Sequence, residues 1–134
     1  MSTLKVNTIQ NTSAAHSSTP EEIAQGRAKS WIAFDGSGTV SIYDSFNVSS
    51  LTDNGTGDYS ITMTNAMSNA NYSVVGNAGL GTSAYLTVHI HCKVPSGFSQ
   101  DPTTTVYRIV NSKDGGASGA EDTTRVACSV FGDQ

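Results

Sequence analysis

Apolar and polar residues alternate along most of this chain with a period of two. The longest such run is Tyr85–Val94, whose apolar face consists of Leu86, Val88, Ile90, Cys92 and Val94. This alternation is typical of β-strands with one buried face, because successive side chains point to opposite sides of a sheet. Clusters of turn-forming residues, such as Asp35-Gly36-Ser37-Gly38, separate neighbouring runs.

The pattern predicts an all-β head over residues 28–134. Further alternating runs lie at 31–34, 40–48, 59–63, 72–75, 104–110 and 125–131. Short strands separated by turns at this spacing favour an antiparallel, jelly-roll-like β-sandwich. Within it, we expect one long strand that presents a shared face made by Val40, Ile42, Phe46 and Val48.

Residues 19–27 interrupt this pattern with the signal of one short α-helix. The Thr19 side chain can accept a hydrogen bond from the backbone N–H of Glu22, and Pro20 suits the first helical position. We expect Gly26 to end the helix after about two turns.

The first eighteen residues form a separate segment, which we call the arm (1–18). Alternation over 4–10 predicts a strand, and residues 11–18 read as a connector that spans roughly 25 Å when extended. A lone strand needs partners for its backbone N–H and C=O groups. These partners lie either on another chain, which a connector of this length favours, or on the edge of the chain's own head. The expected contact residues are Leu4, Val6, Thr8 and Ile9.

Composition argues against several classes of function. Of the 134 residues, 37% are hydrophobic and only 13% are charged, which is typical of a single domain rich in β-strands. The net charge of −4 comes without a basic cluster, so we do not expect nucleic-acid binding. No apolar run has the length of a membrane span, and the N-terminus lacks the pattern of a secretion signal. We therefore expect synthesis and folding in a cytosol, with no membrane insertion.

His89 and His91 are the best candidates for chemistry. They lie two residues apart in an alternating run, so both imidazoles project from one strand face and can reach one metal ion. Three such pairs on a three-fold axis would supply six nitrogen ligands for a transition metal. The alternative, that both are polar residues on a solvent face, is favoured because two ligands rarely define a site. We expect no resident cofactor.

Enzymatic activity is not expected from this sequence. No serine lies in a Gly-x-Ser-x-Gly elbow, and Asp44 is the one acid within an apolar strand face. Several aromatic residues suggest a platform on which sugar rings could stack, although aromatics in strands are more often core or interface anchors. These residues are Trp31, Phe34, Tyr43, Tyr72 and Tyr85.

Three stretches of the chain resemble one protein family. They are STLKVNTIQNTS at 2–13, TPEEIAQGRAKSW at 19–31 and DSFNVSSLTDNGTGDY at 44–59. In amino-acid sequence and in order along the chain, they resemble the small tail-fibre proteins of marine and cyanobacterial tailed phages. The resemblance extends from about Ser2 to Val75, and beyond Gly76 only the general pattern of strands is shared.

The resemblance implies a virion structural protein, a tail-fibre or tail-tip subunit that is usually a homotrimer and binds a host-surface glycan or protein receptor. It also implies that the arm pairs with neighbouring subunits or another virion protein of the tail or capsid. Assembly onto the particle exterior would take place in the host cytoplasm. A capsid decoration or head-fibre protein and a polysaccharide depolymerase are the alternatives. The candidate receptor-contact residues are Tyr85, His89, His91 and Phe98.

Overall fold

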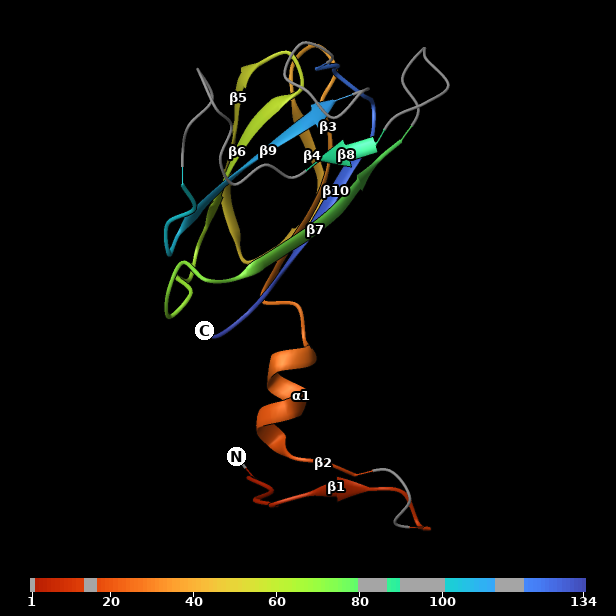
Figure 1. Cartoon of the computed structure of the whole chain (residues 1–134), viewed down its shortest axis with the longest axis vertical. Coiled ribbons are helices and arrows are strands. Elements are labelled where there is room, and N and C mark those ends of the chain that lie inside the picture. The colour runs from red at the N-terminus through yellow and green to blue at the C-terminus, as the bar shows by residue number, and fades with distance from the viewer. Residues whose placement is uncertain (1, 14–16, 80–86, 90–100, 113–119) are drawn as a thin grey trace.

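The computed structural model describes residues 2–13, 17–79, 87–89, 101–112 and 120–134, with the backbone alone described at 87–89. The head is a sandwich of two four-stranded antiparallel sheets (Figure 1). The first sheet has the order β4-β3-β10-β7 and comprises β3 (Ser30–Asp35), β4 (Ser41–Phe46), β7 (Ser73–Ala78) and β10 (Val126–Phe131). The second has the order β5-β6-β9-β8 and comprises β5 (Val48–Gly55), β6 (Asp58–Met63), β8 (Thr87–His89) and β9 (Val106–Ser112). The expected all-β sandwich is confirmed.

The core lies between the two sheets and is built from alternate positions of their central strands. Phe34 on β3 meets Tyr59 on β6 edge to face, with ring centroids 4.9 Å apart. Burial of each large side chain contributes roughly 1.5–3 kcal/mol to stability. The main buried members are Ile32, Phe34, Tyr59, Ile61, Met63, Tyr107, Ile109, Val126, Cys128 and Val130.

A single residue, Asn47, joins β4 to β5 and carries the chain from the first sheet to the second. Its φ of 56° lies in the left-handed region, which asparagine tolerates better than most residues. The side-chain Nδ2 donates to Lys29 O at 3.0 Å and to Asn65 O at 3.1 Å, while Oδ1 accepts from Asn65 N at 2.7 Å. We call this set of contacts the Asn47 corner.

The Asn47 corner corrects one expectation from the sequence. The single long strand expected over 40–48 is wrong, because β4 ends at Phe46 and the chain turns into the other sheet. The period of two continues across the turn, so the alternation alone could not reveal the break. The side-chain hydrogen bonds of Asn47 stabilise the turn by replacing contacts that a continuous strand would make.

The helix α1 (Pro20–Gly26) begins and ends where the sequence predicts. Thr19 Oγ1 accepts from Glu22 N at 3.2 Å, and the Glu22 carboxylate accepts from Thr19 N at 2.8 Å, which forms a capping box. Gln25 Nε2 donates to Asp133 Oδ1 at 3.2 Å, so the helix adjoins the C-terminal end of the chain (Figure 1). Within the described residues, no helix has the length and hydropathy needed to cross a membrane.

The arm forms a small hairpin apart from the head. Strand β1 (Ile9–Gln10) pairs antiparallel with β2 (Ser17–Ser18) in a two-stranded sheet that joins neither head sheet. The arm therefore does not fold back as an edge strand of its own head. Strand β2 lies at the end of the expected connector and supplies Ile9–Gln10 with backbone partners from the same arm, so the expectation that these partners lie on another chain or on the head is wrong for these two residues.

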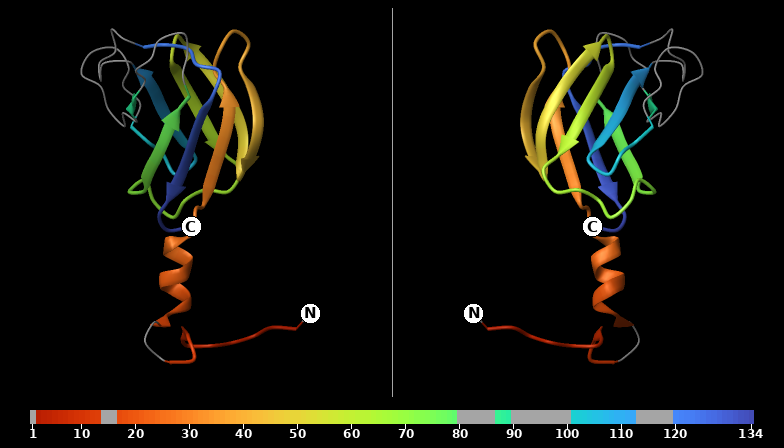
Figure 2. Two further views of the ribbon diagram at one scale, coloured as in Figure 1. Left: turned by 90° about the vertical axis from the view of Figure 1, so that its right-hand side faces the viewer. Right: turned by 90° about the vertical axis from the view of Figure 1, so that its left-hand side faces the viewer.

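The strand expected over 4–10 is wrong for most of its length. Of the four residues expected to make contacts, only Ile9 lies in a strand, and the segment before it has no regular secondary structure. Figure 2 shows this first segment running sideways from the base of the helix, away from the head. The residues of the expected strand that lie outside β1 include Leu4, Val6 and Thr8.

Cys128 and Tyr107 make a polar contact inside the core, with the sulfur and the hydroxyl oxygen 3.5 Å apart. Burial raises the pKa of the Cys128 thiol to about 11, and burial also raises the pKa of Tyr107 above its ordinary range. Both groups therefore stay protonated in the folded chain at pH values where the unfolded chain ionises.

We expect the free energy of unfolding to fall as pH rises from about 9 through about 11, because only the unfolded state loses the Cys128 proton there. The contribution of this thiol is about 3 kcal/mol. Urea unfolding between pH 8 and pH 11 measures the slope. A Cys128→Ala variant is less stable at every pH but should show a shallower slope, and equal slopes would contradict the assignment.

We expect Asn47→Ala to lower the free energy of unfolding by about 2–4 kcal/mol, because it removes the hydrogen bonds to the backbone of Lys29 and Asn65 and places alanine at a left-handed φ. Asn47→Gly keeps the backbone conformation and loses only the hydrogen bonds, so its cost should be about 1–2 kcal/mol smaller. Urea denaturation of both variants tests this order. An alanine variant as stable as the parent chain would show that the corner does not constrain the fold.

Candidate functional site

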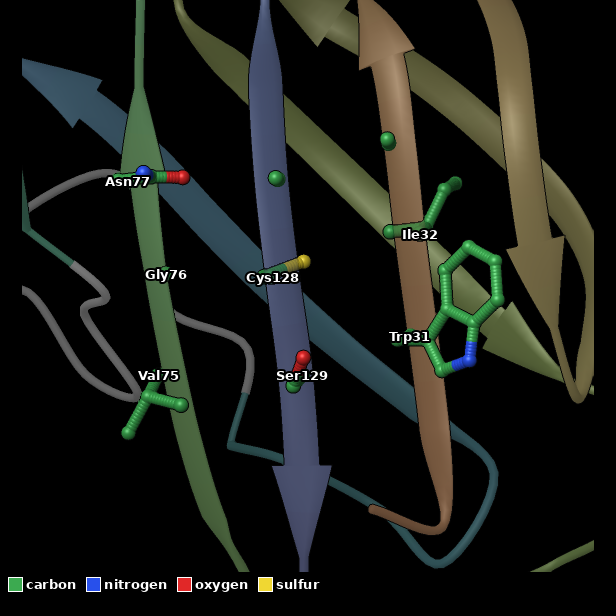
Figure 3. A pocket seen from close by; sticks show the side chains of 9 residues that line it. Trp31, Ile32, Val75, Gly76, Asn77, Cys128 and Ser129 are labelled. Carbon is green, nitrogen blue, oxygen red and sulfur yellow. The ribbon is translucent and has the colours of Figure 1, made fainter.

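The outer face of the first sheet carries a shallow trough of about 440 Å³ (Figure 3). Three neighbouring strands line it, and each contributes three consecutive residues: 31–33 on β3, 127–129 on β10 and 75–77 on β7. We call this feature the β10 trough, because β10 runs along its floor between the other two strands (Figure 3).

The strand register explains why a trough forms here. Ser129 lies directly between Trp31 and Val75, so one row across the sheet places a small residue between two larger ones. In the next row, Ala127 lies between Ala33 and Asn77. Because residues opposite one another in a sheet share a face, the small side chains of β10 make a low floor and the flanking strands make the walls.

The lining of the β10 trough is neutral. None of its nine lining residues is charged, and the polar side-chain groups are the Asn77 amide, the Ser129 hydroxyl and the Trp31 indole N–H. Trp31 extends the apolar surface toward the edge of the sheet, where the opposing residue Phe46 on β4 is exposed. The surface therefore suits an apolar or neutral ligand better than an ion.

Gly76 allows β7 to lie close to β10 beside the trough. A Cβ at this position would lie 2.5 Å from Ala127 O and 2.9 Å from Cys128 Cβ, both closer than ordinary contacts. Any side chain would thus push β7 away from β10 and widen the trough. The glycine is required by packing within the sheet and not by a positive φ.

Asp35 and Arg125 both contact Tyr43 at the end of the head away from the arm, where the Tyr43 hydroxyl lies 3.2 Å from Asp35 Oδ2. The Tyr43 hydroxyl donates to Thr124 O at 2.8 Å, and the Arg125 guanidinium lies 5.7 Å from the centre of the Tyr43 ring. Hydrogen bonds from Ser37 lower the pKa of Asp35, which keeps that carboxylate ionised. These contacts hold the charges away from the β10 trough.

The end of the head opposite the arm, which we call the apex, is formed by the β3–β4 and β5–β6 turns (Figure 2). Asp122 connects them: its Oδ1 accepts from Gly57 N at 2.7 Å and lies 3.0 Å from the Tyr59 hydroxyl. That hydroxyl also lies 2.8 Å from Gly36 O. Burial, and next the hydrogen bond with Asp122, raise the pKa of Tyr59, so it stays protonated and holds the turns together.

The described part of the chain does not test the residues predicted to contact a receptor, so their arrangement stays a prediction. Tyr85, His91 and Phe98 lie outside the described residues. His89 lies on β8, where its backbone pairs with Val110 near the apical end of β9. No group of three potential metal-ligating side chains occurs among the described residues, and a metal held by His89 and His91 stays a prediction.

The four described residues of the predicted aromatic platform do not form a single surface, and the fifth, Tyr85, lies outside the described residues. Phe34 is fully buried in the core, and the Tyr72 hydroxyl donates to Thr103 O at 2.8 Å. Trp31 lines the β10 trough, whereas Tyr43 bonds with Thr124 near the apex. Ala127 and Ser129, the small residues of β10 in the trough, were not predicted as site residues. Their alternation with larger apolar residues near the end of the chain indicates a strand with one face of small side chains.

Comparison of the chain with protein-family models, with curated proteins and with solved structures returned no match. The functional argument therefore depends on the arm, the β10 trough and the arrangement of the two ends of the head.

We expect Gly76→Ala to lower the free energy of unfolding by about 1–3 kcal/mol, since its methyl group would collide with backbone and side-chain atoms of β10. Asn77→Ala, one residue further along β7 with an exposed side chain, should change stability by less than about 0.5 kcal/mol. Thermal unfolding of the two variants provides the comparison. Equal melting temperatures would mean that β7 can move without cost.

Proposed function

We propose that this protein is a structural component of a tailed-phage particle, a homotrimeric tail-fibre or tail-tip subunit whose head contacts the host surface. The arm attaches the subunit to neighbouring copies and to another virion protein. Its place would be the exterior of the particle, reached by assembly in the host cytoplasm. The resemblance of residues 2–75 to phage tail-fibre proteins suggests this class, and the distribution of exposed apolar residues supports it.

The single observation that carries the proposal is the exposed apolar surface of the arm. Leu4 is 85% exposed, Ile9 is 55% exposed and Val6 is 38% exposed. Apolar side chains gathered on a short segment outside the core are typical of residues that a partner covers. The β1–β2 hairpin pairs the backbone of only four residues. The residues that precede it are therefore the part of the arm best suited to backbone pairing with a partner.

The arrangement of the head supports separate roles for its two ends. The arm, the helix and the C-terminus all lie at one end, which leaves the apex free at the other (Figures 1 and 2). Attachment through the arm would then direct the apex outward. We propose that the head binds a host-surface glycan or protein receptor, and the contact residues to test are the ones predicted from the sequence, Tyr85, His89, His91 and Phe98.

A catalytic role has less support from the structure. Asp44 lies exposed on the edge strand β4, and its carboxylate accepts a hydrogen bond from Ser45 N at 2.8 Å. A glycoside hydrolase needs a pair of carboxyl groups on either side of the bond that it cleaves. An exposed acid bonded to its own backbone neighbour does not suggest such a pair, so binding is the function proposed.

The arm can be tested without disturbing the head. We expect Leu4→Ser with Val6→Ser to abolish incorporation into purified particles and to leave the unfolding midpoint unchanged. The matched control is Lys5→Ser with Asn7→Ser, which alters the intervening positions and should be incorporated normally. Immunoblots of gradient-purified particles measure incorporation, and light scattering of the parent chain should give the mass of a trimer.

Gold-labelled antibody on intact particles then locates the protein. Labelling of the tail is the expected result, whereas labelling of the capsid would replace the tail-fibre proposal with that of a decoration protein. A monomeric parent chain that is missing from particles would overturn both.

A further inference from the structure

We propose that the β10 trough of one copy of this chain receives residues 4–8 of a neighbouring copy. This inference depends on the proposed function in one respect, namely that the arm joins subunits to one another. It goes further by naming the receiving surface and the side chains that enter it, Leu4 and Val6.

The spacing of the two surfaces matches. The two rows of residues that line the trough, marked by Ser129 and Ala127 on its floor, lie two residues apart along β10. Leu4 and Val6 are also two residues apart, so in an extended segment they lie on one face at the same separation, roughly 6.6–6.8 Å. One apolar side chain can therefore enter each row.

The chemistry of the two surfaces also matches. The trough has a neutral lining with an aromatic wall at Trp31 and an exposed aliphatic wall at Val75. In the arm, Lys5 and Asn7 alternate with the apolar residues, so in an extended segment they would face away from the trough into water. Burial of Leu4 and Val6 would cover apolar surface on both partners without burying a charge.

The direction of the arm favours a neighbouring copy over the same molecule. The hairpin β1–β2 fixes Ile9 beside Ser18, close to the start of the helix, and the preceding residues run sideways from there (Figure 2). Residues 2–8 form no helix or strand, so they can adopt an extended conformation when a partner offers an edge or a groove. This segment extends away from its own head at the foot of the helix, so the head that it can meet is that of another copy displaced toward that level (Figure 2).

Such a contact also explains why a ring of copies would form. The arm and the trough are two different surfaces of one chain, so their contact is heterologous and each copy both gives and receives an arm. A heterologous contact produces a closed ring when the rotation between copies closes, and three copies are the smallest ring beyond a dimer. Two copies that exchanged arms reciprocally would form a closed two-fold dimer, so a trimer requires that each copy receives the arm of one neighbour and gives its own arm to the other.

Disulfide trapping between full-length chains tests this inference. One chain carries Leu4→Cys and the other carries Val75→Cys, both with Cys92→Ser so that Cys128, which is buried, is the remaining native thiol. After the two chains are mixed, dissociated, reassembled and oxidised, we expect a mixed disulfide dimer in high yield. The matched control replaces Val75→Cys with Ile42→Cys, because Ile42 is 43% exposed, close to the 49% of Val75, but lies outside the trough.

The design separates the possible occupants of the trough. A mixed dimer at least tenfold more abundant with Val75→Cys than with Ile42→Cys supports the inference. A chain that carries both Leu4→Cys and Val75→Cys should give linked trimers, whereas a monomer closed on itself would show that the arm fills its own trough and would overturn the inference. Equal trapping at Val75 and Ile42 would overturn it as well.

A charge substitution provides a second measurement. We expect Val75→Lys to weaken trimer assembly at least tenfold, because a lysine in the trough would meet Leu4 or Val6, and Ile42→Lys to change it less than twofold. Circular dichroism confirms that both variants fold. If the parent chain is a trimer and is incorporated into particles, yet Val75→Lys assembles normally, the proposed function stands and the trough is not the receiving surface.

Discussion

The fold depends on one residue, Asn47, at which the chain passes from the first sheet to the second. Its side chain bonds to Lys29 before β3 and to Asn65 after β6, so three segments that are distant in sequence meet at the base of the head. The corner makes β4 and β5 the adjoining edges of the two sheets, which closes one side of the sandwich. With that side fixed, the last strand of the chain is left to fill the centre of the first sheet.

The position of β10 has a direct consequence for the surface. On its inner face, β10 contributes Val126, Cys128 and Val130 to the core. On its outer face, the side chains of Ala127 and Ser129 are smaller than those of Trp31 and Val75 beside them, which leaves a hollow in the surface of the sheet. The same six-residue strand thus creates both the packing that stabilises the head and the hollow that a partner can fill. Stability and binding are divided between its two faces, because successive side chains of a strand point in opposite directions.

The arm and the head meet different physical requirements. The head buries its apolar residues within one chain, whereas the arm keeps Leu4, Val6 and Ile9 exposed beside a hairpin too small to form a core. Two paired residues on each strand give little stability by themselves. Burying the arm against another copy would let one chain fold first and assemble afterwards, which is how the proposed attachment and the proposed receiving trough fit together.

The sequence by itself determined the local structure of this protein. Alternation located β3, β6 and β10 as strands, and the Thr19 capping signal located the helix, because both depend on neighbours within a few residues. Only the tertiary structure decided the break at Asn47, the pairing of β1 with β2 and the placing of β10 between β3 and β7. Each of these depends on which distant backbone groups and side chains come together, and a periodic pattern along the chain carries no information about that choice. For the same reason the candidate site, assembled from three strands far apart in sequence, could be recognised only after folding.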